Sequence, residues 1–342
     1  MTLRIAINGF GRIGRCVLRA LVESGDSDIE IVAINDLAPP ENIAHLLKYD
    51  SVHGRLNAPV VVDGDRLKVG ARSIRLTAIH TPEDLPWRDV DIAYECTGLF
   101  TDRDAAARHL KNGSKRVLIS APGRNADKTV VYGVNHTSLT AGDVIVSNAS
   151  CTTNCLAPVA MVLDRAFGIK TGYMTTIHAF TGDQPSHDTN HKDLYRARAA
   201  SMSMVPTSTG AARAISLVLP HLAGRLEGSA VRVPTPNVSM VELCFMPERG
   251  ATPEAINAAI AEAAAGELAG VLSCEEDPLV SVDFNHDPHS SCFAAAQTTV
   301  TRNGMARVVS WYDNEWGFSN RMLDTGRRIG ALLQTPPLKL AS

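Results

Sequence analysis

The stretch LRIAINGFGRIGR, residues 3–15, decides the fold of the first half of the chain. Its first six residues form an apolar run typical of a short buried strand, and three glycines follow. A helical pattern then continues through Leu18 and Leu21, and a second apolar run at 29–34 ends at Asp36. The sequence therefore predicts a strand, a glycine turn, a helix and another strand in that order.

The three glycines have separate tasks in such a unit. Gly9 permits the tight turn, Gly11 lets backbone approach a pyrophosphate, and Gly14 lets helix and strand pack closely. The pyrophosphate would lie on N–H groups at the helix N-terminus. Asp36 can accept hydrogen bonds from a ribose diol and would repel a 2′-phosphate, which predicts a dinucleotide site that prefers NAD to NADP. The alternative is a structural glycine turn in another α/β unit.

Further short apolar runs continue the α/β pattern. Runs on either side of Asp63-Gly64-Asp65 predict a hairpin. The ends of the later strands carry Thr97, Gly98 and Ser120, and strand ends are where an open parallel sheet binds ligand. Ser120 is equally suited to be a simple turn residue. The other predicted strands of this half are 91–96, 116–120, 130–134 and 144–146.

The stretch SNASCTTNC, residues 147–155, contains the best candidate nucleophile. Ser150 is a good N-cap, which puts Cys151 in the first turn of a helix, and apolar residues at spacings of three to four from Leu156 to Phe167 predict one apolar face of that helix. Free N–H groups and the helix dipole favour a thiolate there, the nucleophilic form of sulfur. The alternative is an inert buried cysteine, but the neighbouring Ser and Thr residues favour catalysis.

A histidine is the best candidate partner of this thiol. Residues 173–177 predict a strand that ends at His178. If the imidazole lies beside Cys151, it can take the thiol proton and later handle a proton of the substrate. The spacing alone does not place the two in contact, so a structural histidine at a strand end stays open.

Residues 183–208 form a long polar stretch with little regular pattern, which is typical of a functional segment or an interface. The run 207–212 then opens a helix, and hydroxyls at a helix N-terminus suit a phosphate. Arg196 and Arg232 can add guanidinium groups for phosphate oxygens. Either arginine can instead be a solvated surface charge.

The rest of the chain predicts an antiparallel or mixed sheet, from runs at 238–245, 280–284 and 307–311, with helices near 253–265 and 317–334. The motif His286-Asp287-Pro288-His289 has no partner cluster and no HExxH spacing. It is interpreted as a loop, and no metal is expected.

Composition excludes several classes of protein. A length of 342 residues suits two domains, and 45% hydrophobic residues suffice for their cores. A formal charge of −3 gives no basic field, so nucleic acid is not expected as the principal partner. No apolar run has the length of a membrane span, and the N-terminus lacks a signal-peptide pattern. The seven scattered cysteines are typical of a reducing cytoplasm rather than of a disulfide framework.

Together these segments resemble the phosphorylating glyceraldehyde-3-phosphate dehydrogenases of bacterial type, in order along nearly the whole chain. The matching segments are NGFGRIGR (8–15), AIND (33–36), KYDSVHGR (48–55), SNASCTTNCLAP (147–158), HKDLYRARAA (191–200), PTSTGAA (206–212), RVPTPNVS (232–239) and WYDNEWGFSNR (311–321). The resemblance implies an N-terminal Rossmann dinucleotide-binding domain at 1–150 and an α+β catalytic domain at 151–316. It also implies that a helix at 317–342 packs back on the first domain, and that the protein is a homotetramer whose 183–208 loop lies near a neighbour's cofactor.

The resemblance assigns roles by position, with Cys151 as nucleophile and His178 as its base. Besides the three glycines, it matches cofactor contacts to Arg12, Ile13, Asp36, Ser120 and Asn314. It matches one phosphate site to Thr181 and Arg232, and the substrate contacts with the other phosphate site to Ser150, Thr152, Arg196, Thr209 and Gly210. His80 departs from the arginine of many bacterial members. Thr189-Asn190 replaces a Leu-Pro of some strictly NAD-using relatives, which leaves some NADP use open.

The activity implied is the NAD-dependent oxidation and phosphorylation of glyceraldehyde 3-phosphate, with inorganic phosphate, in glycolysis or gluconeogenesis. It would proceed through a thiohemiacetal and a thioester of Cys151. One alternative is erythrose-4-phosphate dehydrogenase, a sister family that tends to lose the phosphate-site features kept here at Thr181-Gly182 and Thr209-Gly210. A dinucleotide-binding thiol redox sensor without a substrate is the alternative from another class.

Overall fold

The computed structural model describes residues 2–334, which fold into two compact units. The first unit contains the chain up to 130, residues 136–148 and the chain from 321 onward, and the second contains 131–135 and 149–320. The functional limits predicted from the sequence, at 150 and 316, stay a prediction. The part of the predicted last helix beyond Gln334 lies outside the described residues.

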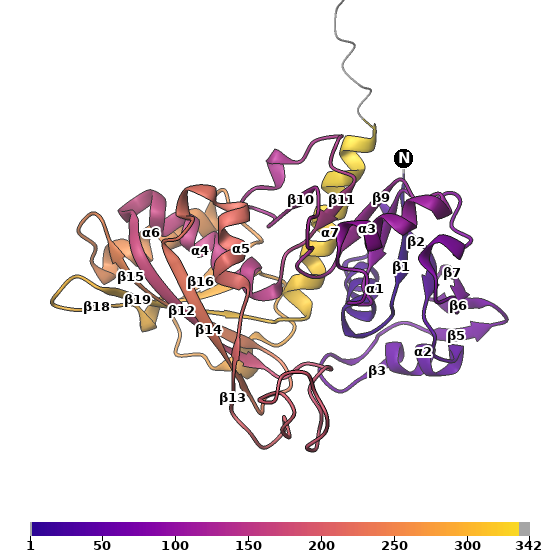
Figure 1. The fold of residues 1–342 in the computed structure, drawn as a ribbon, viewed down its shortest axis with the longest axis horizontal. Helices are drawn as coiled ribbons and strands as arrows, with labels where there is room; N and C mark the ends of the chain where they lie inside the picture. The colour runs from indigo at the N-terminus through magenta and orange to yellow at the C-terminus, as the bar shows by residue number, and fades with distance from the viewer. Residues whose placement is uncertain (1, 335–342) are drawn as a thin grey trace, which may run out of the picture. The chain divides into compact units, whose positions relative to one another are not determined.

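The first unit is built on a nine-stranded sheet in the order β10-β11-β9-β8-β1-β2-β7-β6-β5 (Figure 1). β1 pairs in parallel with β2 on one side and with β8 on the other. The strand order therefore reverses at β1, which is where open α/β sheets bind ligands. The strands are β1 Leu3–Asn8, β2 Ile29–Asn35, β5 Val60–Asp63, β6 Arg66–Val69, β7 Arg72–Thr77, β8 Ile92–Glu95, β9 Arg116–Ile119, β10 Lys128–Thr129 and β11 Ile145–Ser147.

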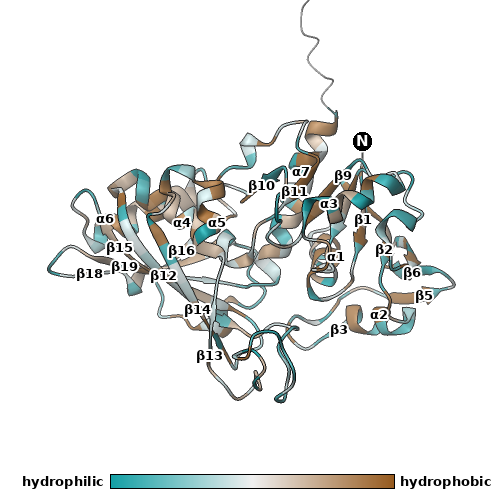
Figure 2. Ribbon diagram, in the orientation of Figure 1, coloured by the Kyte–Doolittle hydropathy of each residue, from teal (hydrophilic) through white to brown (hydrophobic). Residues whose placement is uncertain are grey.

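Three helices accompany this sheet, and the predicted hairpin is confirmed. β5 and β6 pair antiparallel around the turn at Gly64, whose φ of +60° suits a glycine. The helices are α1 Arg12–Ser24, α2 Pro40–Lys48 and α3 Arg103–Ala106, and a small pair of strands, β3 Tyr49–Asp50 and β4 Gly54–Arg55, follows α2. The ribbon of β1 is mostly brown in Figure 2, because most of its residues are hydrophobic, and its isoleucines are fully buried.

A buried polar network ties the carboxyl ends of three central strands together. Glu95 accepts hydrogen bonds from Asn8 Nδ2 at 2.7 Å and from His109 Nε2 at 2.8 Å. Asn35 Nδ2 donates to Asn8 Oδ1 at 2.8 Å. All four residues are buried, and such satisfied networks fix a unique geometry. The network lies directly beneath the turns that begin at Gly9, and it holds those turns in place.

The later half of α7, Trp316–Gln334, belongs to the first unit. Tyr94 donates its hydroxyl hydrogen to Met322 O at 2.9 Å. Arg327 forms ion pairs with Asp26 at 2.6 Å and with Asp28 at 2.8 Å. The hydrogen bond from Arg327 lowers the pKa of Asp28. These contacts fasten the later half of α7 to β8 and to the loop before β2.

The second unit contains an eight-stranded mixed sheet in the order β13-β14-β12-β15-β19-β17-β16, with β18 beside β19 (Figure 1). β12 pairs in parallel with β14 and antiparallel with β15. The strands are β12 Ile169–Ala179, β13 Val205–Ser208, β14 Leu226–Val233, β15 Ser239–Pro247, β16 Leu272–Glu275, β17 Ser291–Ala294, β18 Thr299–Val300 and β19 Ala306–Tyr312. The mixed sheet expected from the sequence is thus confirmed.

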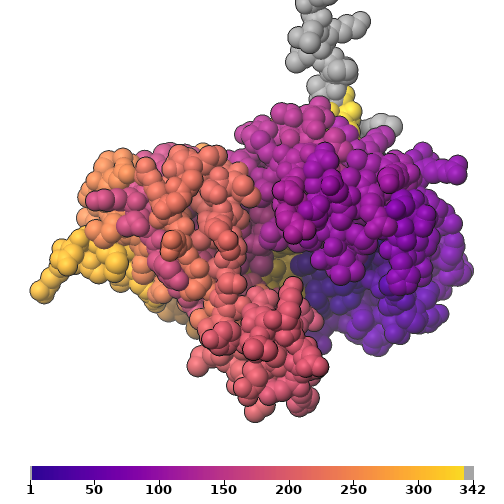
Figure 3. Space-filling view, viewed as in Figure 1, coloured from indigo at the N-terminus to yellow at the C-terminus, as the bar shows by residue number. Residues whose placement is uncertain are grey.

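The segment 183–208 carries β13 at its end, a strand that the sequence did not predict. β13 pairs antiparallel with β14 and so extends the sheet at its edge. Before it the chain is irregular, held by hydrogen bonds such as Thr189 N to Ala197 O at 2.9 Å. This rose-coloured segment lies on the surface of the second unit in Figure 3.

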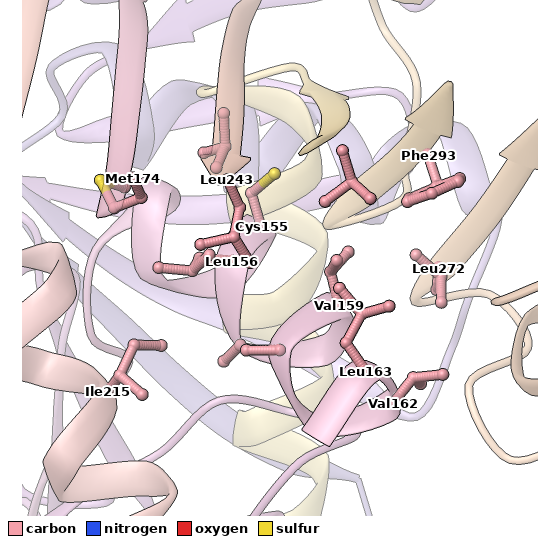
Figure 4. Packing of buried hydrophobic residues seen from close by; sticks show 14 of the residues in the cluster. Cys155, Leu156, Val159, Val162, Leu163, Met174, Ile215, Leu243, Leu272 and Phe293 are labelled. Carbon is pink, nitrogen blue, oxygen red and sulfur yellow. The ribbon is translucent and has the colours of Figure 1, made fainter. Parts of the chain in front are cut away.

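The core of the second unit forms between the sheet and three helices, α4 Cys151–Phe167, α5 Ala211–Val218 and α6 Pro253–Ala265. Figure 4 shows Leu156, Val159 and Leu163 of α4 among side chains from the strands, including Leu243 and Phe293. The helical spacing that predicted one apolar face of α4 is therefore confirmed.

Two predicted strands are wrong. Residues 281–284 form a 3-10 helix, in which Asp283 accepts a hydrogen bond from Val280 N at 2.8 Å and closes the turn. The alternation of valines there reflects exposure rather than a pleat, because Val280 and Val282 are 58% and 72% exposed. Residues 130–134 are a turn region that follows the short strand β10.

Candidate active site

Cys151 is the first residue of α4. The Ser150 hydroxyl accepts a hydrogen bond from Thr153 N at 3.1 Å, so Ser150 caps the helix as predicted. Ala149 precedes it with a φ of +58°, in the left-handed region that non-glycine residues seldom adopt. This strained turn sets the direction in which the chain enters the helix, and with it the position of the thiol.

His178, at the end of β12, faces this thiol. Its Nε2 lies 3.5 Å from Cys151 Sγ, and its Nδ1 lies 2.7 Å from Ala179 O. Because a carbonyl oxygen can only accept, Nδ1 carries the proton of the neutral ring and Nε2 presents its lone pair to the sulfur. The ring is thus held as the tautomer that can accept the proton of the Cys151 thiol.

Burial shifts the pKa of both Cys151 and His178. It lowers the pKa of His178 to about 3, with the positive charge of Arg232 acting in the same direction. Burial also raises the pKa of the Cys151 thiol, although Arg232 and a hydrogen bond with Thr152 oppose that rise. Burial therefore opposes both a thiolate at Cys151 and an imidazolium at His178. The thiolate favoured by the helix N-terminus in the sequence analysis is thus countered by burial, and it stays a prediction.

Arg232 lies beside His178 on the neighbouring strand, at paired positions of β14 and β12. Its Nη1 donates to Ala179 O at 3.0 Å and to the Thr181 hydroxyl at 2.9 Å. The same carbonyl of Ala179 thus fixes both the histidine and the arginine. Arg232 Nε is buried and has no hydrogen-bond partner among the described residues. A buried charged donor of this kind suits an oxyanion.

Arg196 belongs to the same group of side chains through Asp183. Arg196 Nη1 donates to Asp183 Oδ2 at 3.2 Å, and the Thr181 hydroxyl donates to Asp183 Oδ1. Arg196 Nε donates to the Thr207 hydroxyl at 3.1 Å. The nearby positive charges and the Thr181 hydrogen bond keep the pKa of Asp183 low, against the effect of burial. Its carboxylate thus holds the arginine and the threonine in place.

Thr209 and Gly210 lie where β13 gives way to α5. The Thr209 hydroxyl accepts a hydrogen bond from Ala211 N at 3.1 Å. Gly210 is the N-cap of α5 and provides no side-chain cap, so the helix N-terminus stays available to an anion. Thr207, the partner of Arg196, stands just before this turn.

Asn314 is the one predicted cofactor residue that lies in the second unit. Its Oδ1 accepts a hydrogen bond from the Ser239 hydroxyl at 2.8 Å. Ser239 Oγ in turn accepts from Ala179 N at 3.0 Å. A short chain of hydrogen bonds therefore joins Asn314 to the residue that follows His178.

The remaining predicted cofactor residues lie around the turn after β1 in the first unit. A Cβ on Gly14 would lie 2.4 Å from Gly9 O, whereas one on Gly11 would meet nothing within 4 Å. Gly11 also begins α1 without a side-chain cap, which leaves room and N–H donors for a pyrophosphate. The predicted roles of Gly11 and Gly14 therefore fit the geometry of this turn.

Acidic and polar side chains frame the same turn. Asp36 follows β2, and its Oδ2 accepts a hydrogen bond from Phe10 N at 2.7 Å. The two Nη atoms of Arg12 donate hydrogen bonds to the Asp50 carboxylate at 2.5 and 3.1 Å. Arg12 and Ile13 are the first two residues of α1, so a ligand would contact them at the first turn of that helix. Ser120 follows β9, and its N–H donates to Glu95 O at 3.0 Å.

Replacing Gly14 by alanine should destabilise the chain by about 1–3 kcal/mol, because the new methyl group overlaps the Gly9 carbonyl. Gly11→Ala is the matched variant, since its methyl group enters open space. It should change stability by less than about 0.5 kcal/mol and yet weaken dinucleotide binding, because it obstructs the approach of the pyrophosphate. Urea unfolding and a fluorescence titration with NAD measure the two effects. Equal unfolding free energies for both variants would contradict the assigned roles.

Comparison with known proteins bears directly on this arrangement. Residues 3–103 match the family model of the glyceraldehyde 3-phosphate dehydrogenase NAD-binding domain, and residues 150–314 match that of its C-terminal domain. The glyceraldehyde-3-phosphate dehydrogenase of Cereibacter sphaeroides is 63% identical over 333 residues, covering 97% of this chain and 100% of the relative. The chain belongs to the glyceraldehyde-3-phosphate dehydrogenase family. The enzymes of that name from Xanthobacter flavus and Geobacillus stearothermophilus are 61% and 52% identical over 334 residues, each covering 97% of this chain and 100% and 99% of the relative.

As a member of the glyceraldehyde-3-phosphate dehydrogenase family, the chain carries its NAD-binding domain in the first unit, with NAD as the cofactor. The turn at Gly9–Gly14 fits that cofactor, for the reasons given above. Within 2–334 no helix is long and apolar enough to cross a membrane.

Sequence reasoning missed two residues that organise this dehydrogenase-family site. Tyr312 is fully buried, and its hydroxyl lies 2.9 Å from the hydroxyls of both Thr152 and Thr176. It thereby ties the first turn of α4 to β12. Asp183 is the other, since it bridges Thr181 and Arg196. Tyr312 falls within a segment that carried the family resemblance, but nothing in its spacing indicated which side chains it contacts.

Proposed function

We propose that this chain oxidises and phosphorylates glyceraldehyde 3-phosphate to 1,3-bisphosphoglycerate, with NAD and inorganic phosphate. The observation that carries the proposal is the Cys151–His178 pair, a thiol 3.5 Å from an imidazole nitrogen whose tautomer makes it the acceptor. The glyceraldehyde-3-phosphate dehydrogenases of Cereibacter sphaeroides and Xanthobacter flavus are similar to this chain over their whole length, which supports the same activity here.

The chemistry begins with transfer of the thiol proton from Cys151 to His178 Nε2 as sulfur attacks the aldehyde carbon. The product is a thiohemiacetal, whose oxygen takes up the proton that His178 Nε2 has just accepted, so the imidazole is neutral again and lies within reach of the new hydroxyl. Bound NAD supplies the acceptor for the hydride of that carbon. His178 accepts the hydroxyl proton at Nε2, and the oxidised species is a thioester of Cys151. Inorganic phosphate then attacks the thioester carbon, the C–S bond breaks, and Cys151 leaves as a thiolate that is reprotonated.

Two anion sites serve this sequence of steps. Arg232 and Thr181 form one, and the buried Nε of Arg232 is its unused donor. Arg196, together with Thr209 and Gly210 at the N-terminus of α5, forms the other. Ser150 and Thr152 hold the turn that presents the thiol. In the first unit, Gly9, Gly11, Arg12, Ile13, Gly14, Asp36 and Ser120 would hold NAD. Asn314, which lies in the second unit, is matched to a cofactor contact by the family resemblance.

Asp36 supports NAD rather than NADP. Its carboxylate is anchored by Phe10 N and by Ala38 N, at 2.7 and 2.9 Å, directly after β2. The negative charge of this carboxylate would repel a 2′-phosphate placed there.

The assembly is proposed to be a homotetramer in the cytoplasm. The segment 183–208 exposes large apolar side chains, with Leu194 at 82% and Met202 at 80%, alongside Tyr195 and Met204. A surface patch of this kind is typical of an interface. All seven cysteines are free thiols, as a reducing compartment requires.

One assay tests the function. Purified protein receives NAD, aldehyde and phosphate, and NADH formation is followed as each component is omitted in turn. We expect sustained NADH formation that depends on all three, with glyceraldehyde 3-phosphate preferred to erythrose 4-phosphate and NAD preferred to NADP. Faster turnover of erythrose 4-phosphate, or turnover indifferent to phosphate, would overturn the proposal. Thiol oxidation without NAD reduction would favour a redox sensor instead.

A further inference from the structure

A cluster of three possible metal ligands lies in the second unit, among residues to which the proposed chemistry assigns no role. It consists of Asp287, His289 and Cys292, whose ligand atoms all lie within 4.8 Å of one another. The motif around His286 has no HExxH spacing by itself, and its sulfur partner stands three residues after His289. The fold supplies that partner as Cys292 on strand β17.

The sheet fixes the position of the sulfur. Cys292 is paired with Ser273 on β16 and with Trp311 on β19. Side chains at paired positions point to the same face of a sheet, so Ser273 and Trp311 flank the sulfur. Cys292 is fully buried, and Val238 and Phe284 pack around it. The thiol is therefore held by rigid strands rather than by a loop.

Ser273 adds an independent sign of a ligand position. Its hydroxyl oxygen is buried, and within the described part of the chain it interacts with the Cys292 sulfur without reaching the geometry of a full hydrogen bond. A buried hydroxyl that is only partly satisfied is costly, so this position favours a stronger partner beside the sulfur. As the cross-strand neighbour of Cys292, this oxygen is placed to complete a set of four donor atoms.

The loop 285–290, which comes directly before β17, carries the other two proposed ligands, Asp287 and His289. Phe284 stacks on Trp311, with ring centroids 5.7 Å apart, and anchors the start of the loop on the sheet. His286 then adopts a φ of +69°, and its N–H donates to Asp313 Oδ2 at 2.7 Å. This turn directs Asp287 and His289 toward the strand, where His289 N and Nδ1 each lie 2.8 Å from Asp287 Oδ1.

The cluster is partly exposed to solvent. The side chains of Asp287 and His289 are each 27% exposed, whereas Cys292 is closed off by the sheet. An ion can therefore reach the carboxylate and the imidazole from solvent and meet the sulfur behind them. The partly exposed side chains give the ion an entry path, and the buried Cys292 sulfur gives it a ligand in a fixed position.

We propose that Asp287, His289 and Cys292 form a binding site for Zn²⁺, with the Ser273 hydroxyl or a water molecule as the fourth ligand. One thiolate, one imidazole and one carboxylate are ligands that zinc accepts in tetrahedral geometry. Bond lengths of about 2.0–2.3 Å place such ligand atoms roughly 3.3–3.8 Å apart, so the loop has only to close slightly on the strand. On binding, the S–H bond of Cys292 is replaced by an S–Zn bond and one proton passes to solvent, so the affinity rises with pH.

The test uses Zn²⁺ itself, on the full-length chain carrying Cys151→Ser so that the reactive thiol does not compete for the ion. Competition with a coloured chelator gives the stoichiometry and affinity. Titration with Cd²⁺ reports a sulfur ligand through thiolate-to-metal charge-transfer absorption. We expect one Zn²⁺ per chain and a charge-transfer band, both removed by the further change Cys292→Ala. His289→Gln should weaken binding by about 10–100-fold or more, the loss seen even when only a supporting contact of a ligand is removed.

Two controls keep the outcome decisive. Cys244→Ala, a partly exposed cysteine of β15 outside the cluster, should leave both signals unchanged. His289→Gln alters a partly exposed loop side chain, so it should fold even if Cys292→Ala does not. Unfolding with and without Zn²⁺ adds a second readout: the ion should raise the midpoint of the parent and not that of His289→Gln. Unchanged affinity in His289→Gln, or no binding by the parent, would overturn the site.

Discussion

Replacing Cys151 by serine should lower turnover on the order of 10⁴-fold or more while NAD binding stays within twofold, because the nucleophile and its leaving group are both lost. His178 sharpens this expectation. Burial lowers its pKa to about 3, so this imidazole cannot rescue a serine, whose hydroxyl is a far weaker acid and a poorer leaving group than a thiol. Steady-state NADH formation and a fluorescence titration with NAD measure the two quantities. A serine variant with turnover within tenfold of the parent would refute Cys151 as nucleophile.

Cys155 provides the matched control for this experiment. It lies one helical turn further along α4, fully buried, with its sulfur 3.5 Å from the Ser291 hydroxyl. Burial raises the pKa of Cys155 to about 12, so it stays protonated and inert. Cys155→Ser should therefore retain most of the turnover. If Cys155→Ser lost as much turnover as Cys151→Ser, the substitutions would be acting by disturbing α4 and not by removing the nucleophilic sulfur.

His178→Asn should lower kcat by about 10²–10⁴-fold, the usual contribution of a positioned general base. Without the imidazole, the thiol must lose its proton to solvent, and its raised pKa makes that loss rare at neutral pH. The residual activity should then climb as the pH rises, since more thiolate forms. Rate against pH for both proteins measures this. His221→Asn, a surface histidine paired with Asp164 at 3.0 Å, is the control that should leave the rate unchanged.

The same substitution should also change how stability depends on pH. His178 is neutral when folded, with a pKa of about 3, and takes up a proton near pH 6.5 when unfolded. The unfolded chain therefore binds more protons between those values, so the stability of the parent falls as the pH drops from about 6.5 toward 3. His178→Asn should lack this part of the slope. Urea unfolding at pH 7 and pH 5 compares the two, and an equal loss of stability in both would contradict a buried neutral histidine.

The parts that were predictable from the sequence are those set by local chemistry. The turn at Gly9 and Gly14 was predictable because only glycine tolerates its φ of +89° and the close approach to the carbonyl. The helix that starts at Cys151 was predictable from its cap and its apolar face. In both places the residue type is required by backbone geometry within a few positions along the chain.

The parts that were not predictable depend on contacts between distant segments. Burial raises the pKa of the Cys151 thiol. The residues around this thiol come from segments far along the chain, such as Tyr312, whose hydroxyl contacts Thr152. Strand β13 forms because β14 offers it a sheet edge, not because Val205–Ser208 has a strong pattern of its own. Local sequence cannot encode such neighbours.

The most direct test asks which atom carries the acyl group when phosphate is withheld. The protein is mixed with NAD and glyceraldehyde 3-phosphate, quenched in acid, and digested for peptide mapping by mass spectrometry. Cys151, 3.5 Å from its base, should carry a 3-phosphoglyceryl thioester that disappears once phosphate is added before the quench. A burst of NADH with an unmodified Cys151, or with the acyl group on another residue, would contradict the account.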